Sequence, residues 1–193
     1  MNDLNFPAAD NFGGVDKFWF VETKNIVSIP EPVDEIIPDD VVLVSGAAWS
    51  KGWVTKGTIS FNEREQNSSH GELYRPVLEG FASKITPELK KAIRNLVGRK
   101  LVIIYKDHNG YYNIVGNSEN YLEASYSLNP GTKPGDRNGI ALRFEGEGAR
   151  SFFIYTGQIV QAGGVVIPGE IGGIVIDLSQ VRLVTANSGP ITV

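Results

Sequence analysis

The chain has 193 residues, of which 41% are hydrophobic, and this is enough to build one well-packed core. Its 18 basic and 22 acidic side chains give a net charge of −4, so it lacks the basic surplus with which proteins neutralise the phosphates of nucleic acid. It contains no cysteine, which excludes disulfide frameworks, thiolate metal sites and cysteine nucleophiles.

Neither a targeting segment nor a membrane span is predicted. Met1 to Pro7 has no basic region followed by an apolar run, so it does not resemble a signal peptide. No apolar stretch approaches the ~20 residues that a membrane-spanning helix needs. We therefore expect a protein made in the cytoplasm, with no membrane partner.

The first third of the chain predicts short strands around an acidic loop. Residues 1–14 are expected to form a flexible arm, followed by strands at Lys17 to Val21 and Ile26 to Ile29. Pro30 to Asp40 contains three prolines and five acidic residues, which indicates an extended, solvated loop. Val41 to Ser45 is a continuous apolar run, typical of a strand that is buried on both faces.

The next segment predicts two strands separated by a polar loop. Trp53 to Phe61 is expected to be a strand, Asn62 to Gly71 a loop, and Glu72 to Phe81 an alternating strand. Pro76 lies inside the last of these, which favours an edge strand or a bulge, since proline cannot donate to a ladder.

One helix leading into one hairpin is the strongest local pattern. Thr86 is a suitable N-cap and Pro87 a suitable first helical residue, and Gly98 is placed to end the helix in the left-handed conformation. The chain then predicts a hairpin whose Asn109-Gly110 favours a tight primed turn. The apolar residues at helical spacing are Leu89, Ala92, Ile93, Leu96 and Val97.

The last third predicts more strands. Tyr121 to Leu128, Ile140 to Glu145 and Arg150 to Tyr155 are expected strands, and Asn129 to Gly139 is a turn-rich exposed loop. Residues 158–193 are rich in glycine and valine and predict a β extension, packed on the same domain or on a neighbouring subunit.

A lone amphipathic helix has only sheet against which to bury its apolar stripe. The predicted fold is therefore mainly β: a single β-sandwich or barrel over residues 15–157, with one flanking helix at about residues 86–98.

No pattern of residues indicates catalysis, a cofactor or a metal. The two histidines, His70 and His108, both fall in predicted loops and have no accompanying nucleophile motif. Asp107 to Gly110 lacks the later acidic ligand of a calcium loop. Glu145 and Glu147 could face the same side as a carboxylate pair for glycoside hydrolysis, but their spacing is common by chance. We therefore expect a protein that is not an enzyme and that holds neither cofactor nor metal.

Adjacent aromatic residues raise the question of what covers the sheet. Neighbours in a strand point to opposite faces, so Phe18 and Trp19, Tyr111 and Tyr112, or Phe152 and Phe153 cannot share one core. Two interpretations remain open: a two-layer core with some exposed aromatics, or a sheet whose outer face is covered by another subunit.

The order of these elements resembles tail-tube structural proteins of tailed bacteriophages, in the divergent form encoded by prophages. The resemblance covers roughly residues 13–156. It rests on Gly13-Gly14-Val15 before an aromatic strand, the strand Glu72 to Phe81 before the helix, the run Leu101 to Gly110, and the strand Arg137 to Gly146 after a Pro/Gly loop.

The resemblance implies a virion structural protein without catalytic residues. Such proteins assemble into hexameric rings that stack into a tube, with other tail proteins as partners and DNA as non-specific cargo in the lumen. This chain would then be made in the bacterial cytoplasm and reside in the virion tail. The alternative is a non-catalytic β-sandwich binding module, for instance for carbohydrate, that uses Trp49 or Trp53. The candidate assembly contacts lie in the two loops: Glu31, Asp34, Asp39, Pro130, Lys133, Pro134, Asp136 and Arg137.

Overall fold

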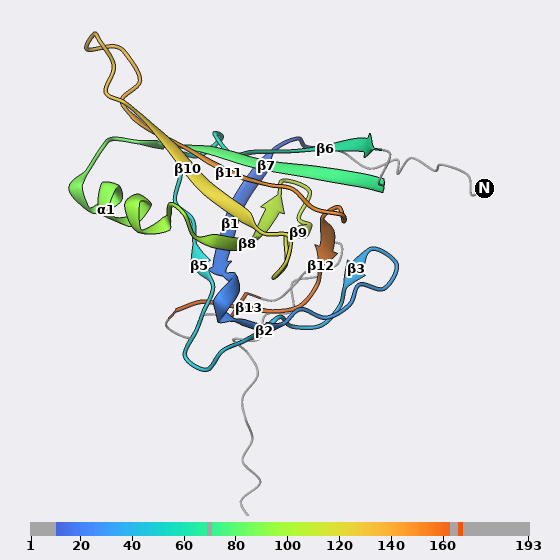
Figure 1. The fold of residues 1–193 in the computed structure, drawn as a ribbon. Coiled ribbons are helices and arrows are strands. Elements are labelled where there is room, and N and C mark those ends of the chain that lie inside the picture. Colours follow the sequence, from blue (N-terminus) through green and yellow to red (C-terminus); the bar gives the residue numbers. More distant parts are fainter. Residues whose placement is uncertain (1–10, 69–70, 163–165, 168–193) are drawn as a thin grey trace, which may run out of the picture.

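The structure, a computed structural model, describes residues 11–68, 71–162 and 166–167. Within these residues it is mainly β with a single α-helix, as predicted (Figure 1). The elements are β1 (Val15–Glu22), a short 3-10 turn (Thr23–Asn25), β2 (Ile26–Ser28), β3 (Ile36–Ile37), β4 (Val42–Leu43), β5 (Ser50–Lys51), β6 (Ser60–Ser68), β7 (Gly71–Ser83), α1 (Pro87–Leu96), β8 (Lys100–Asp107), β9 (Tyr112–Val115), β10 (Leu122–Asn129), β11 (Gly139–Gly146), β12 (Phe153–Tyr155), β13 (Ile159–Val160) and β14 (Val166–Ile167).

Strand β8 is the central strand of the fold. One of its edges pairs with β1 from Leu101 to Asp107. The other edge pairs with β10 at Lys100 and Leu101 and with β9 from Ile103 to Lys106. From β10 the sheet continues in the order β11, β7 and β6, all antiparallel. These long strands lie across β1, β8 and β9 and form a second layer (Figure 1).

The first core fills the space between the two layers. Phe18, Leu101 and Ile103 project into it from β1 and β8, and Leu78 and Phe144 reach it from β7 and β11. Phe18 and Phe144 meet edge to face, with 5.5 Å between ring centroids, a favoured geometry for aromatic pairs.

Helix α1 contributes to the same core. Thr86 Oγ1 accepts a hydrogen bond from Leu89 N (3.2 Å), which makes Thr86 the N-cap, and Gly98 follows the helix with a φ of +74°. Ile93 is buried in the core and Leu89 and Leu96 pack against it. The apolar stripe that the helix buries is thus narrower than predicted, because Ala92 and Val97 are exposed.

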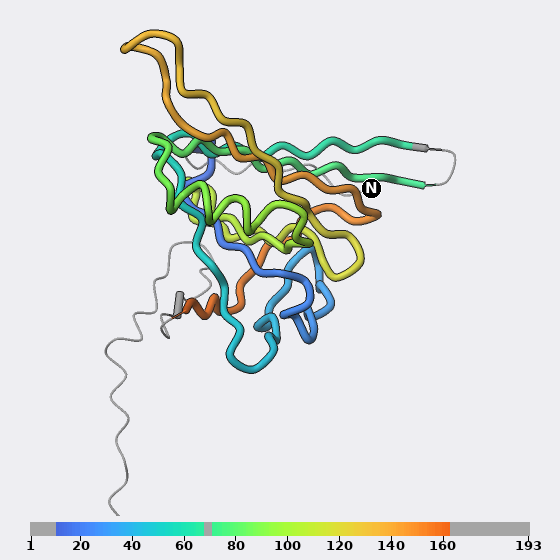
Figure 2. The backbone as a smooth tube through the Cα atoms, turned by 60° about the vertical axis from the view of Figure 1, so that its left-hand side comes forward, coloured from blue at the N-terminus to red at the C-terminus, as the bar shows by residue number. Residues whose placement is uncertain are grey.

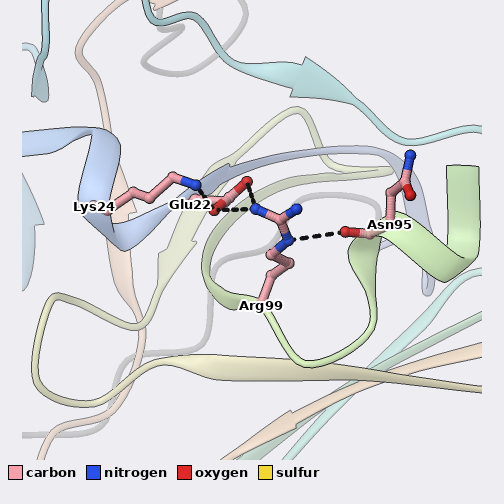
Figure 3. Close-up of polar contacts among 4 residues, drawn as sticks. All are labelled: Glu22, Lys24, Asn95 and Arg99. Atoms are coloured by element: carbon pink, nitrogen blue, oxygen red, sulfur yellow. Dashed lines mark hydrogen bonds and ion pairs between the residues drawn. The ribbon is translucent and has the colours of Figure 1, made fainter.

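Arg99 fastens the chain after the helix to the end of β1 (Figure 3). Its Nη1 donates to both carboxylate oxygens of Glu22, at 2.8 and 3.0 Å, and its Nε donates to the carbonyl of Asn95. Lys24 Nζ lies 2.7 Å from the same carboxylate, and the two cations, Lys24 foremost, lower the pKa of Glu22. Because both cations remain substantially exposed to solvent, the contribution of the ion pairs to stability is modest.

A second core covers the opposite face of β1, β8 and β9. Trp19, Ile104 and Tyr112 project into it, and it is closed by Trp49 and Tyr155 from segments later in the chain. Phe18 and Trp19 are each only 1% exposed, on opposite faces of β1. The chain therefore covers these aromatic neighbours itself, and they give no reason to invoke another subunit. Ile159, fully buried in this core, also carries the domain past residue 157.

Two strand predictions around residue 60 were wrong. Residues 62–68, predicted as loop, belong to β6, whereas residues 53–59 contain no strand. Most residues on both faces of β6 are polar, so the strand has no apolar periodicity by which the sequence could identify it. Its conformation is decided by pairing with β7. Pro76 is in β7, which is internal, and pairing with β11 is interrupted there, between Val77 and Tyr74.

Two further local predictions need correction. Val42 and Val44 are 49% and 44% exposed, so the run from Val41 to Ser45 is not a strand buried on both faces. The hairpin turn is not primed, because Asn109 does not have a positive φ. Instead, Gly110 N donates to Asp107 O and Gly110 has a φ of +94°, as in a three-residue loop with a bulge.

Candidate assembly surface

The sheet β10–β11–β7–β6 ends in two unpaired strand edges. Strand β6 pairs with β7 along its whole length, and among the described residues no strand pairs with its other edge. Strand β10 pairs with β8 only at Leu122 and Glu123, so one edge of Ala124 to Asn129 has no strand neighbour in the described chain. Unpaired edges present rows of backbone donors and acceptors that can take up another strand.

The β6 edge is long and its free amides can be assigned. Tyr74 N donates to Gly148 O, which lies on the β11 side of β7. Alternate residues of β7 therefore point their amides toward β6, and Arg75 is one of these; its register partner is Arg64. It follows that the odd-numbered residues of β6, among them Glu63 and Glu65, point their N–H groups toward the free edge.

The face of this sheet that points away from the core is polar and hollowed. Arg143 lies between two acidic residues: its Nη1 contacts Glu79 Oε1 and its Nε donates to Glu145 Oε2 (3.0 Å). Arg75 Nε donates to Glu147 Oε2 (3.0 Å). The hollow measures about 880 Å³, and its charged lining is three arginines against five glutamates: Arg64, Arg75, Arg143, Glu79, Glu119, Glu123, Glu145 and Glu147.

The buried side of β6 carries a carboxylate with an unusual environment. Glu63 Oε1 accepts a hydrogen bond from Ser151 Oγ, while its Oε2 is buried without a protein partner. Burial raises the pKa of Glu63. This contact ties the edge strand to the segment that follows β11.

The loop between β10 and β11 projects from the body at the end of its hairpin (Figures 1 and 2). Asp136 Oδ2 accepts hydrogen bonds from the backbone N and hydroxyl of Thr132 and from Lys133 N, each at 2.8 Å. These bonds lower the pKa of Asp136 and hold the turn that contains Pro130 and Pro134. Of the two basic residues in this loop, Lys133 is exposed, and Arg137 has its guanidinium 5.0 Å from the Phe81 ring centre.

The segment predicted as an acidic, solvated loop is only partly a loop: Ile36–Ile37 form β3, which pairs with β12 and buries Ile37. Glu31 Oε2 accepts from Arg150 Nη1 (3.2 Å), and Asp40 Oδ1 accepts from Gln158 N (2.6 Å). Asp34 has a φ of +48°, in the left-handed region, and both Asp34 and Asp39 are exposed.

The two predicted contact loops lie far apart. The structure places residues 129–139 and residues 31–40 at opposite ends of the molecule (Figures 1 and 2). It does not bring the sequence-predicted candidates into one site, and the two free sheet edges were not identified from sequence. The signal for β6 was the alternation of Asn62, Arg64 and Gln66 with acidic residues, which resembles an ordinary polar loop.

The tryptophan and histidine candidates from the sequence lie in different environments where the structure describes them. Trp49 is 1% exposed and is a core residue, whereas Trp53 is 74% exposed with Lys51 Nζ 4.7 Å from its ring centre. His108 Nδ1 lies 3.0 Å from Gly13 O, so it ties the hairpin turn to the residues before β1. His70 lies outside the described residues.

In the described part of the chain, no group of three or more potential metal ligands is present, and no helix is long and apolar enough to span a membrane. Comparison with protein-family models, with curated proteins and with solved structures gives no significant match to this chain.

Proposed function

We propose that this chain is a self-assembling structural subunit whose copies join edge to edge, as in the phage tail tubes that its sequence resembles. The observation that carries the proposal is the pair of free edges, β6 and the outer part of β10, at opposite sides of the four-strand section β10–β11–β7–β6 of the sheet. A strand edge with no partner among the described strands favours association with another chain.

Joining β10 of one copy to β6 of the next continues the sheet without conflict. Because the four strands alternate in direction, β6 and β10 run oppositely, and copies of the same orientation place them antiparallel. On the core side, Leu128 of β10 would meet Phe61 of β6, and Tyr126 would meet Glu63. On the other side, Ser125 and Ser127 would meet Asn62 and Arg64. The outward face therefore continues with polar residues, and on neither face do like charges lie opposite each other.

Pairing of β6 with β6 is disfavoured by charge. A two-fold antiparallel pairing that uses seven or more residues of Ser60–Ser68 centres on Glu63, Arg64 or Glu65, and each of these then meets its own copy. Like charges directly opposite are destabilising in a sheet. The segment Ala124 to Asn129 carries no charge, so the head-to-tail arrangement avoids this repulsion. Head-to-tail interfaces close into rings when the rotation allows it.

The tail-tube assignment extends this proposal. A hexameric ring is what the resemblance implies, with the acidic loop and the 129–139 loop, which lie at opposite ends, as contacts between stacked rings. The hollow face, with five glutamates against three arginines, would suit a lumen through which DNA passes without binding, because like charge repels phosphate.

The test blocks the β6 edge without touching the internal ladder. In Glu65→Pro, proline removes an amide that points toward the free edge, and it is compatible with an edge strand. We expect the full chain to form rings or tubes in sedimentation and negative-stain electron microscopy, and Glu65→Pro to remain monomeric with an unchanged circular dichroism spectrum. Glu65→Gln is the matched control and should assemble. A wild-type chain that stays monomeric at high concentration and with candidate tail partners, or a Glu65→Pro variant that assembles normally, would contradict the proposal.

The exposure of Trp53 favours one alternative, a carbohydrate-binding module with this ring as platform. That alternative predicts glycan binding that is lost in Trp53→Ala and retained in Lys51→Ala. Our proposal predicts that neither the parent chain nor these two variants bind glycan.

A further inference from the structure

A patch of exposed valines lies on the outer face of the small β2–β4 ribbon. Ile26 and Leu43 are register partners, and both pack against the second core. Their neighbours point the other way, since side chains alternate along a strand. Val27, Val42 and Val44 are accordingly 64%, 49% and 44% exposed. We call these three residues the valine patch.

The chain continues close to this patch. Val160 O accepts a hydrogen bond from Trp49 N (2.9 Å), so β13 lies beside a residue only five positions after Val44. Ile167, at the end of β14, is the register partner of Ile159 in β13. Residues 168–193 follow from this point. Ten extended residues reach about 30 Å at ~3.3 Å per residue, which is ample to span the ribbon.

The sequence of that segment favours burial of one of its faces. Ile174, Ile176 and Leu178 alternate with Val175, Asp177 and Ser179, which is the pattern of a strand with one buried face. The segment carries only three charged residues among 26, namely Glu170, Asp177 and Arg182. An apolar patch that no described residue covers and a largely apolar segment therefore lie within reach of each other.

We propose that the segment 168–193 docks on the valine patch of its own chain and closes the outside of the second core. The same chain is the source because a tethered segment is present at an effective concentration on the order of mM, above that of a separate copy. Branched side chains such as Ile174 and Ile176 suit a surface of valines, and burial of each such group is favourable. The inference does not depend on the edge-to-edge assembly.

Photo-crosslinking tests the docking site. Because the chain has no cysteine, Val44→Cys accepts a single benzophenone-maleimide probe. Light and ¹⁵N-labelled copies are mixed in denaturant, refolded together, irradiated and analysed by peptide mass spectrometry. We expect crosslinks between position 44 and residues 168–193 that are purely light–light or heavy–heavy. If half of the crosslinked pairs joined a light to a heavy copy, the segment would be docked on another copy, and the proposal would be overturned. The absence of crosslinks to this segment would also overturn it.

Two controls keep the result specific. A probe at Leu128→Cys, an apolar residue that is also 39% exposed but lies near the 129–139 loop, should give no crosslink to residues 168–193. In the Val44→Cys protein, Val27→Asp should lower the crosslink yield several-fold, whereas Val33→Asp, at a residue 63% exposed outside the patch, should leave it unchanged. Equal yields in these two variants would contradict docking on the patch.

Discussion

The two faces of β8 give a quantitative test of how the chain covers its own sheet. Ile103 and Ile104 are adjacent and both 0% exposed, the first in the core beneath β7 and β11 and the second in the core closed by Trp49 and Tyr155. Replacing either by alanine removes roughly three buried carbon groups, about 2.4 kcal/mol of transfer free energy at about 0.8 kcal/mol each. The cavity that remains adds to this, and the expected loss for each variant is about 2–5 kcal/mol.

The measurement is urea unfolding of dilute protein in the Glu65→Pro background, followed by tryptophan fluorescence and checked for monomer by sedimentation. Because the same chain covers both faces, Ile103→Ala and Ile104→Ala should lower the free energy of unfolding by similar amounts. Val33→Ala, at an exposed position, should stay within about 0.5 kcal/mol of the parent. If Ile104→Ala lost less than about 1 kcal/mol in the monomer while Ile103→Ala lost the full amount, the second face would not be covered within the chain.

Three further predictions concern local structure. In Gly52→Ala, the new Cβ would lie 2.0 Å from the ring of the buried Phe18, so we expect a loss of about 1–3 kcal/mol in thermal unfolding, against little change for Gly13→Ala, where no atom lies within 4 Å. Thr86→Ala removes the hydrogen bond to Leu89 N and should destabilise the protein by about 1 kcal/mol, whereas Thr86→Ser should not; equal losses would refute the capping role. The fold lowers the pKa of Glu22, so the stability that Glu22 contributes is present above its unfolded pKa and is lost as pH falls through its folded pKa. The fold raises the pKa of Glu63, so the stability that Glu63 contributes is present below its unfolded pKa and is lost as pH rises through its folded pKa. Unfolding free energies from pH 3 to 7 should therefore show a weaker acid limb in Glu22→Gln and a weaker decline toward neutral pH in Glu63→Gln, and parallel curves for all three proteins would contradict this.

The sequence predicts the parts of the fold where local and tertiary preferences agree. Thr86, Pro87 and Gly98 specify the limits of the helix through capping and backbone preference, and the alternation from Ile140 to Phe144 specifies β11. Strand β6 could not be predicted, because its polar residues lie on a projecting hairpin and its conformation comes from pairing with β7. Burial of Trp49 was equally hidden, since its partners Tyr155 and Ile159 are more than 100 residues away in the chain.

The candidate assembly surface was predictable only in its loops. The Pro/Gly content of residues 129–139 and the acidic residues of 31–40 identify exposed segments from composition alone. The free edges depend on which strands fail to find neighbours, and this is a property of the whole sheet order. Register also reveals the Arg143 network, because Glu79 and Arg143 are register partners on adjacent strands that lie 64 residues apart in sequence.

Hydrogen exchange on the β6 edge tests the central claim most directly. The outward amides of Glu63 and Glu65 should exchange quickly in dilute, monomeric protein and become protected at concentrations where particles form, together with amides of the segment Ala124 to Asn129. The Glu65→Gln variant should show the same protection. Particles that form while both edges continue to exchange at the monomer rate would contradict joining by these strands.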